Sequence, residues 1–123
     1  MTVAMVLVGG AVGAPLRSLT DLWVQARHDS VFPWGTFTVN VVGSLILGSS
    51  VAVVTGLGLP AWALTLVGTG FCGALTTFST FGFETVRLLE EGSTLTAMAN
   101  CLASLVVGLA ACAGGFAATA ALV

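Results

Sequence analysis

Charged residues occupy only two short windows of this 123-residue chain, and this distribution limits what the chain can fold into. The windows span positions 17–29 and 84–91, whereas residues 1–16, 30–83 and 92–123 contain no Lys, Arg, Asp or Glu. With 7% charged residues, against roughly 25% in a soluble domain, the chain cannot build a water-facing surface. This excludes an ordinary soluble enzyme and a disordered segment. The net charge of −2 argues against nucleic-acid binding, which needs clustered Lys and Arg. We expect an integral membrane protein.

The uncharged stretches are long enough for several membrane spans, each of which needs about 20 mainly apolar residues. The stretch 30–83 is too long for one span and suits two joined by a turn. Gly56 to Pro60 supplies that turn, because glycine ends helices and proline starts them. We therefore expect an all-α, four-helix membrane protein forming a single transmembrane domain over residues 1–123. Its expected spans are 2–25, 35–56, 60–83 and 94–120.

The positions of the arginines predict an orientation. With four spans, the loops after the first and third spans share one side of the membrane and contain Arg17, Arg27 and Arg87. The other side, with both termini and the turn near Leu59, has no Lys or Arg. The positive-inside rule therefore places both termini outside.

Three smaller features fit a membrane-embedded chain. The three tryptophans are Trp23, Trp34 and Trp62. Each falls near an expected span end, as interfacial tryptophans do. The N-terminus lacks the basic region of a cleaved signal peptide. The three cysteines are Cys72, Cys101 and Cys112. They lie inside expected spans and lack the spacing of metal ligands, so we interpret them as small packing residues.

Small residues indicate close helix packing. The chain has 16 glycines, and Gly9 and Gly13 form a GxxxG pair. Membrane helices associate through close fit at small residues, since lipid is as apolar as leucine. We expect a tightly packed bundle that forms an oligomer.

Asn40 is a polar residue in the middle of the second expected span. Its amide offers two donors and one acceptor. One interpretation is a hydrogen bond between helices, the commonest use of a membrane Asn. The other is a donor directed into a pore, and the residue alone leaves both open.

The segment 70–83 in the third expected span makes a poor continuous helix. It holds Thr76, Thr77, Ser79 and Thr80 close together, with glycines on either side. Hydroxyls compete for backbone groups and β-branching crowds the helix. A break would free backbone carbonyls, which membranes tolerate only where those groups face a cavity or bind an ion such as Na⁺. The alternative is a kinked helix repaired by threonine hydroxyls.

Two phenylalanines in this segment, Phe78 and Phe81, lie three residues apart and share a helix face. The positive edges of aromatic rings can contact a small anion without trapping it as a lysine would. Such a pair is, however, more often a packing contact than part of a pore.

No carboxylate is expected near mid-membrane, because all five acidic residues fall in the two charged windows. Proton-coupled transport usually needs a titratable group there, so its absence favours passive conduction. No nucleophile–base arrangement is present either, and we expect no enzymatic activity.

The segments Gly9–Arg17, Gly35–Gly43 and Gly68–Phe81 together resemble the fluoride-specific ion channels called Fluc or CrcB. The resemblance is strong in the first three spans and weak in the fourth. It implies a passive, fluoride-selective channel in the plasma membrane that exports fluoride and reduces fluoride toxicity. It also implies two antiparallel subunits with pores along their interface.

The resemblance further implies roles for individual residues. A structural Na⁺, not transported, would be held by the backbone carbonyls of Gly73 and Thr76. The pore would be formed by Asn40, Phe78 and Phe81, and weaker candidates for a polar track are Thr36, Ser79 and Ser104. The fourth span of the family often carries a tyrosine near the pore, where this chain has Asn100.

Two other functions stay open. The chain could be a non-conducting partner subunit of a heteromeric fluoride channel, although its pore residues are all present. A small drug/proton antiporter shares the four-helix plan but needs a carboxylate inside its first span. Since the arginines favour one orientation, we also expect an oppositely oriented paralogue as a plausible second subunit, beside a second copy of this chain.

The orientation is testable. A tag at the C-terminus should react with a membrane-impermeant reagent in intact cells, whereas a tag in the loop near Gly92 should react only after lysis. A C-terminal tag found equally on both sides would contradict the preferred orientation.

Overall fold

The computed structural model describes residues 2–27 and 32–123, without the side chain of Ser79. These residues form helices joined by short turns: α1 (Thr2–Arg27), α2 (Trp34–Leu57), α3 (Ala61–Leu64), the π-helical segment η1 (Thr65–Cys72), α4 (Gly73–Leu75), α5 (Ser79–Glu90) and α6 (Thr94–Leu122). Helices α3, η1, α4 and α5 follow one another as a single interrupted span. Within the described residues, four helical stretches are long and apolar enough to cross a membrane, which confirms the prediction of an all-α chain with four candidate spans. His28 and Asp29, in the first charged window, lie outside the described residues.

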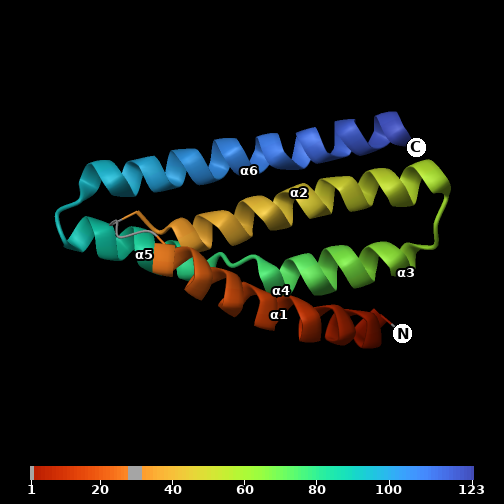
Figure 1. Ribbon diagram of the computed structural model, residues 1–123, viewed down its shortest axis with the longest axis horizontal. Coiled ribbons are helices and arrows are strands. Elements are labelled where there is room, and N and C mark those ends of the chain that lie inside the picture. The colour runs from red at the N-terminus through yellow and green to blue at the C-terminus, as the bar shows by residue number, and fades with distance from the viewer. Residues whose placement is uncertain (1, 28–31) are drawn as a thin grey trace.

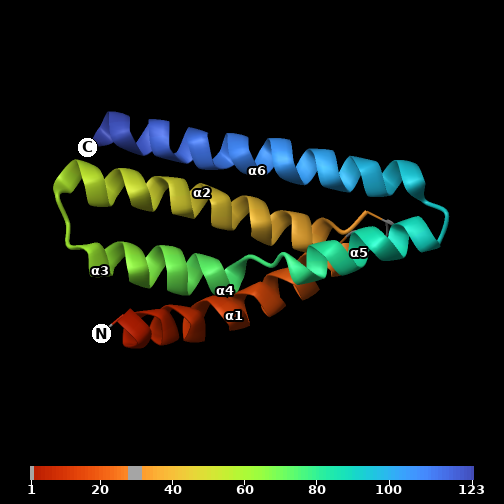
Figure 2. The same cartoon turned by 180° about the vertical axis from the view of Figure 1, so that it is seen from behind.

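The four spans pack side by side along one axis (Figures 1 and 2). Helix α2 lies between α6 and the third span, and α1 runs along the other side of the third span. Both termini lie at the same end of the bundle as the α2–α3 turn (Figure 1). This arrangement matches the expected grouping of the connections into two ends, and the placement of both termini outside stays a prediction.

Glycines end two of the spans where a left-handed backbone is needed. Gly58 follows α2 with φ 64° and donates its N–H to the Val54 carbonyl, and Pro60 precedes α3. Gly92 follows α5 with φ 82°. The third span therefore continues to Glu90 rather than ending near position 83. Charge alone does not end the helix, because long charged side chains can stay on its solvated face.

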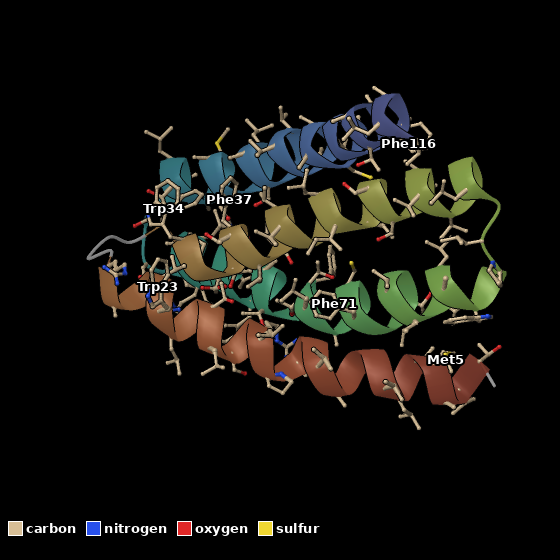
Figure 3. The ribbon with its side chains drawn as sticks, turned by 45° about the vertical axis from the view of Figure 1, so that its right-hand side comes forward. Met5, Trp23, Trp34, Phe37, Phe71 and Phe116 are labelled. Carbon is tan, nitrogen blue, oxygen red and sulfur yellow. The ribbon has the colours of Figure 1, made fainter. Side chains whose placement is uncertain are left out.

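Aromatic residues gather where α1 ends and α2 begins. Figure 3 places Trp23, Trp34 and Phe37 at this end of the bundle, and the rings of Trp34 and Phe37 meet edge to face at 5.9 Å. The Arg27 guanidinium lies 4.3 Å from the centre of the Trp23 ring. Trp62 lies in the short helix α3, at the other end. All three tryptophans thus lie at span ends, and their contact with the membrane interface stays a prediction.

The GxxxG pair of α1 is the contact surface between this helix and the third span. A Cβ added at Gly9 would collide with the Leu66 carbonyl oxygen and lie 2.7 Å from the Phe71 nitrogen. One at Gly13 would collide with the Phe71 carbonyl oxygen. The backbones of α1 and η1 therefore touch directly, as expected for small residues at a membrane helix interface.

Replacing Gly9 by alanine should destabilise the bundle. Alanine favours helix by about 1 kcal/mol over glycine, but its Cβ has no room against the η1 backbone. We expect Gly9→Ala to lower the free energy of unfolding in detergent by about 1–3 kcal/mol, the usual cost of overpacking. The matched control is Gly10→Ala, whose Cβ would lie 3.8 Å from the nearest atom, the Cβ of Ala74. Equal stability of the two variants would contradict this packing.

Candidate functional site

An open groove of about 610 Å³ runs along α2, the third span and α6. It contains the interruption of the third span and six of the candidate metal and pore residues named above: Asn40, Gly73, Thr76, Phe78, Phe81 and Ser104. Its lining residues are Asn40, Gly43, Ser44, Leu47, Gly68, Cys72, Gly73, Thr76, Thr77, Phe78, Phe81, Cys101, Ser104 and Leu105.

The third span is interrupted at residues 76–78, inside the segment where the sequence predicts a break. Leu75 is the last residue of α4, and Thr76 adopts an extended backbone with φ −81° and ψ 161°. Helix α5 begins at Ser79. The interruption is thus confirmed, and it is shorter than the segment 70–83.

Asn40 of α2 pairs with the backbone of the interruption. Its Oδ1 accepts the Thr77 N–H at 2.8 Å, and its Nδ2 donates to the Thr77 carbonyl at 3.1 Å. Both groups of the side-chain amide are thus used on a single residue. The hydrogen bond between spans that the sequence left open is formed, and it goes to the backbone rather than to another side chain.

A glycine one turn further along α2 allows this approach. A Cβ added at Gly43 would collide with the Thr76 side chain. Asn40 and Gly43 lie three residues apart and so share a helix face. The Asn-x-x-Gly pattern therefore has a physical reason, because the amide reaches Thr77 only if the next turn of α2 leaves room for Thr76.

The carbonyls of Gly73 and Thr76 lose the donors that a continuous helix would give them. In an α-helix the N–H of residue i+4 donates to the carbonyl of residue i. For Gly73 that donor is the Thr77 N–H, which instead bonds Asn40. For Thr76 it is the Thr80 N–H, which instead bonds the Thr77 hydroxyl at 3.2 Å. These two are the carbonyls that the family resemblance implies as cation ligands.

Phe78 and Phe81 lie together at the groove. Their ring centres are 6.0 Å apart and the rings are tilted by 44°. Phe78, which directly precedes α5, is 84% exposed, a high value for a large apolar ring inside the third span. The two rings are therefore neighbours, and the surface of Phe78 is open in the single chain.

Thr36 lies away from the groove-lining set and is buried, with 3% exposure. Its hydroxyl donates to the carboxylate of Glu84 on α5. The sequence places Glu84 beyond the third span, whereas the structure places it in α5, one turn after Phe81. The sequence predicted neither the Thr36–Glu84 pair nor the pairing of Thr77 with Asn40. The spacing of Glu84 from Phe81, which is three residues, is the signal that could have indicated a shared face.

Ser104 lines the groove and belongs to a hydrogen-bond network between α5 and α6. Asn100, only 1% exposed, donates from Nδ2 to the Thr85 hydroxyl at 2.9 Å. The Ser104 hydroxyl donates to Asn100 Oδ1 at 3.3 Å. Thr85 in turn donates to the Phe81 carbonyl at 2.8 Å. Asn100 thus ties α6 to the helix that carries Phe81.

The coupling between Asn100 and Thr85 can be measured. In a double-mutant cycle with Asn100→Leu and Thr85→Val, we expect a coupling of about 0.5–1.5 kcal/mol in the free energy of unfolding. As a control, Ser50→Ala removes a bond within α2, to the Ile46 carbonyl, and should not couple with Asn100→Leu. Additive effects of Asn100→Leu and Thr85→Val would contradict a stabilising hydrogen bond between these two side chains.

Comparison with known proteins places this chain in a family. Residues 4–116 match the family described as CrcB-like protein, Camphor Resistance (CrcB). A protein of Frankia casuarinae named fluoride-specific ion channel FluC 1 is 56% identical over 117 residues, which is 90% of each chain. A protein of the same name from Streptomyces avermitilis is 54% identical, again over 90% of each chain. The fluoride-specific ion channel FluC 2 of Mycobacterium tuberculosis is 47% identical over 89% of this chain and 82% of its own. The chain belongs to the CrcB/FluC family of fluoride-specific ion channels.

Proposed function

We propose that this chain is a fluoride-selective, passive ion channel of the cell membrane, without enzymatic activity. The observation that carries the proposal is the groove that combines Asn40, Phe78 and Phe81 in a chain 56% identical to a named fluoride-specific channel. Its role is to let fluoride leave the cytoplasm and so to reduce fluoride toxicity.

The chemistry of the groove suits a small anion. Ring edges of Phe78 and Phe81 carry partial positive charge, and they attract fluoride without the strong binding of a fixed cation. The Asn40 amide has two N–H donors, of which one bonds Thr77, so the second can serve the ion. Weak contacts let the ion leave as readily as it enters, which conduction requires.

The driving force is the membrane potential. Moving one charge through 100 mV is worth about 2.3 kcal/mol, and a negative interior drives an anion outward. The proposed pathway contains no lysine, arginine or carboxylate among its lining residues. Passive conduction therefore suits this chain better than proton-coupled transport, and a drug/proton antiporter is the weaker candidate.

We further propose a structural Na⁺ at the interruption, held by the carbonyls of Gly73 and Thr76. The fit rests on the two donors diverted from these carbonyls, and carbonyl oxygens are hard ligands suited to such a cation. The ion would neutralise the dipoles of these two carbonyls, which belong to residues that line the groove. Two carbonyls are few ligands for a cation, so a second subunit would supply the others.

That second subunit would lie antiparallel to the first and close the groove. Gly73 and Phe78 are exposed in the single chain, which supports a partner surface at this place. The partner is either a second copy or an oppositely oriented paralogue. The arginine bias, with both termini outside, favours the paralogue, and a non-conducting role within such a heteromer is the alternative function.

Flux measurements test the proposal. Liposomes containing the purified chain should release fluoride but not chloride when a potassium ionophore sets the potential. Phe81→Ile should slow fluoride release by roughly tenfold, as expected for an edge contact worth about 1.4 kcal/mol. The matched control is Phe83→Ile, on the same helix but outside the groove.

Equal release of chloride would overturn the selectivity. Unchanged fluoride release from Phe81→Ile liposomes would remove the ring from the pathway. No release from the chain alone, with release restored by a paralogue, would assign it the role of a partner subunit.

A further inference from the structure

The peptide bond between Thr76 and Thr77 lies at the centre of the interruption. We propose that Asn40 and Thr77 are positioning residues for cation binding: they capture two backbone N–H groups and thereby keep the Gly73 and Thr76 carbonyls free. This inference rests on the Na⁺ site of the proposed function. It goes further by naming the residues of a single chain that create that site.

Asn40 frees the Gly73 carbonyl by accepting the Thr77 N–H. A straight helix through this region would pair the Thr77 N–H with the Gly73 carbonyl. Asn40 Oδ1 instead accepts that N–H at 2.8 Å, in a part-buried position. The Gly73 carbonyl therefore depends on Asn40, a residue of another span, for its freedom to bind a cation.

Asn40 also sets the direction of the Thr76 carbonyl. The carbonyl of Thr76 and the N–H of Thr77 belong to one planar peptide group, which is trans, since the described residues contain no cis bond. In a trans peptide these two groups point in opposite directions. Because the N–H points at Asn40, the Thr76 carbonyl points away from it. Asn40 thus sets the direction of one proposed ligand and releases the other.

The Thr77 hydroxyl accepts the Thr80 N–H, which would otherwise bond the Thr76 carbonyl. The Thr80 N–H bonds the Thr77 hydroxyl at 3.2 Å, as a capping hydroxyl does at the start of a helix. The same hydroxyl lies 3.2 Å from the Thr80 hydroxyl. Without it, α5 could extend by one turn and pair Thr80 with Thr76.

A link between the cation and the pathway follows. Asn40 uses its oxygen and one N–H on Thr77, and its remaining N–H is the proposed contact for fluoride. The geometry that frees the two carbonyls therefore also fixes the orientation of this amide. A change in cation binding should accompany any change in the Asn40–Thr77 pair, even when Phe78 and Phe81 are intact.

Cation binding can be read without measuring flux. The unfolding temperature of the purified protein in detergent is followed while NaCl replaces KCl at constant ionic strength, and the half-maximal Na⁺ concentration is recorded. A ligand that binds only the folded protein raises this temperature. We expect Thr77→Val to raise the half-maximal Na⁺ concentration by roughly tenfold, the equivalent of one lost hydrogen bond.

Two further variants serve as controls. Thr77→Ser keeps the hydroxyl, so its half-maximal Na⁺ concentration should equal that of the wild type. Thr65→Val removes a threonine hydroxyl earlier in the same span, which donates to the Ala61 carbonyl within the described residues. This variant should also leave the half-maximal Na⁺ concentration unchanged. Asn40→Leu tests the other partner and should weaken the Na⁺ response as Thr77→Val does. It keeps the test decisive if Thr77→Val fails to fold.

The outcomes separate this inference from the proposed function. A wild-type protein without any Na⁺ response contradicts the proposed Na⁺ site, and the inference with it. A wild-type response that Thr77→Val and Asn40→Leu both retain overturns only the inference. If Thr65→Val weakens the Na⁺ response as much as Thr77→Val does, the effect is a general one on stability, and this result would also overturn the inference.

Discussion

The pairing of the Asn40 amide with the Thr77 backbone is the interaction on which the rest of the site depends. It is made of two hydrogen bonds, at 2.8 and 3.1 Å, between the middle of α2 and the interruption of the third span. In a membrane, unpaired backbone groups cost several kcal/mol each, so a broken helix persists only where other groups replace the lost bonds. The side chain of Asn40 provides that replacement for Thr77, so the Thr77 N–H does not bond the Gly73 carbonyl.

Close packing brings the two partners of this interaction together. Gly43 lets α2 approach Thr76, and Gly9 and Gly13 let α1 support the third span from the other side. The network of Asn100, Thr85 and Ser104 joins α5 to α6 beyond the interruption. Each half of the broken span is thus held by a neighbouring helix, which keeps Phe78 and Phe81 in place although their own span is discontinuous. Small residues and a few hydrogen bonds are the usual means of such packing in membranes.

Much of this architecture could be predicted from the sequence, because it follows from local composition. The uncharged stretches predict four spans, and the threonines and glycines of segment 70–83 predict the break. The partners across helices could not be predicted, since they depend on the rotation and register of whole spans. Glu84 is the clearest example: its charge suggests a position outside the span, yet α5 continues past it and pairs it with Thr36.

The most direct measurement observes the peptide bond between Thr76 and Thr77. These are the only consecutive threonines in the chain, so labelling threonine with ¹³C at the carbonyl and ¹⁵N at the amide isolates this one bond by nuclear magnetic resonance. The account predicts that replacing K⁺ by Na⁺ shifts the Thr76 carbonyl signal. It also predicts that the Thr77 amide proton exchanges slowly in the wild type and faster in Asn40→Leu. A carbonyl signal unmoved by Na⁺, together with amide exchange unaffected by Asn40→Leu, would contradict it.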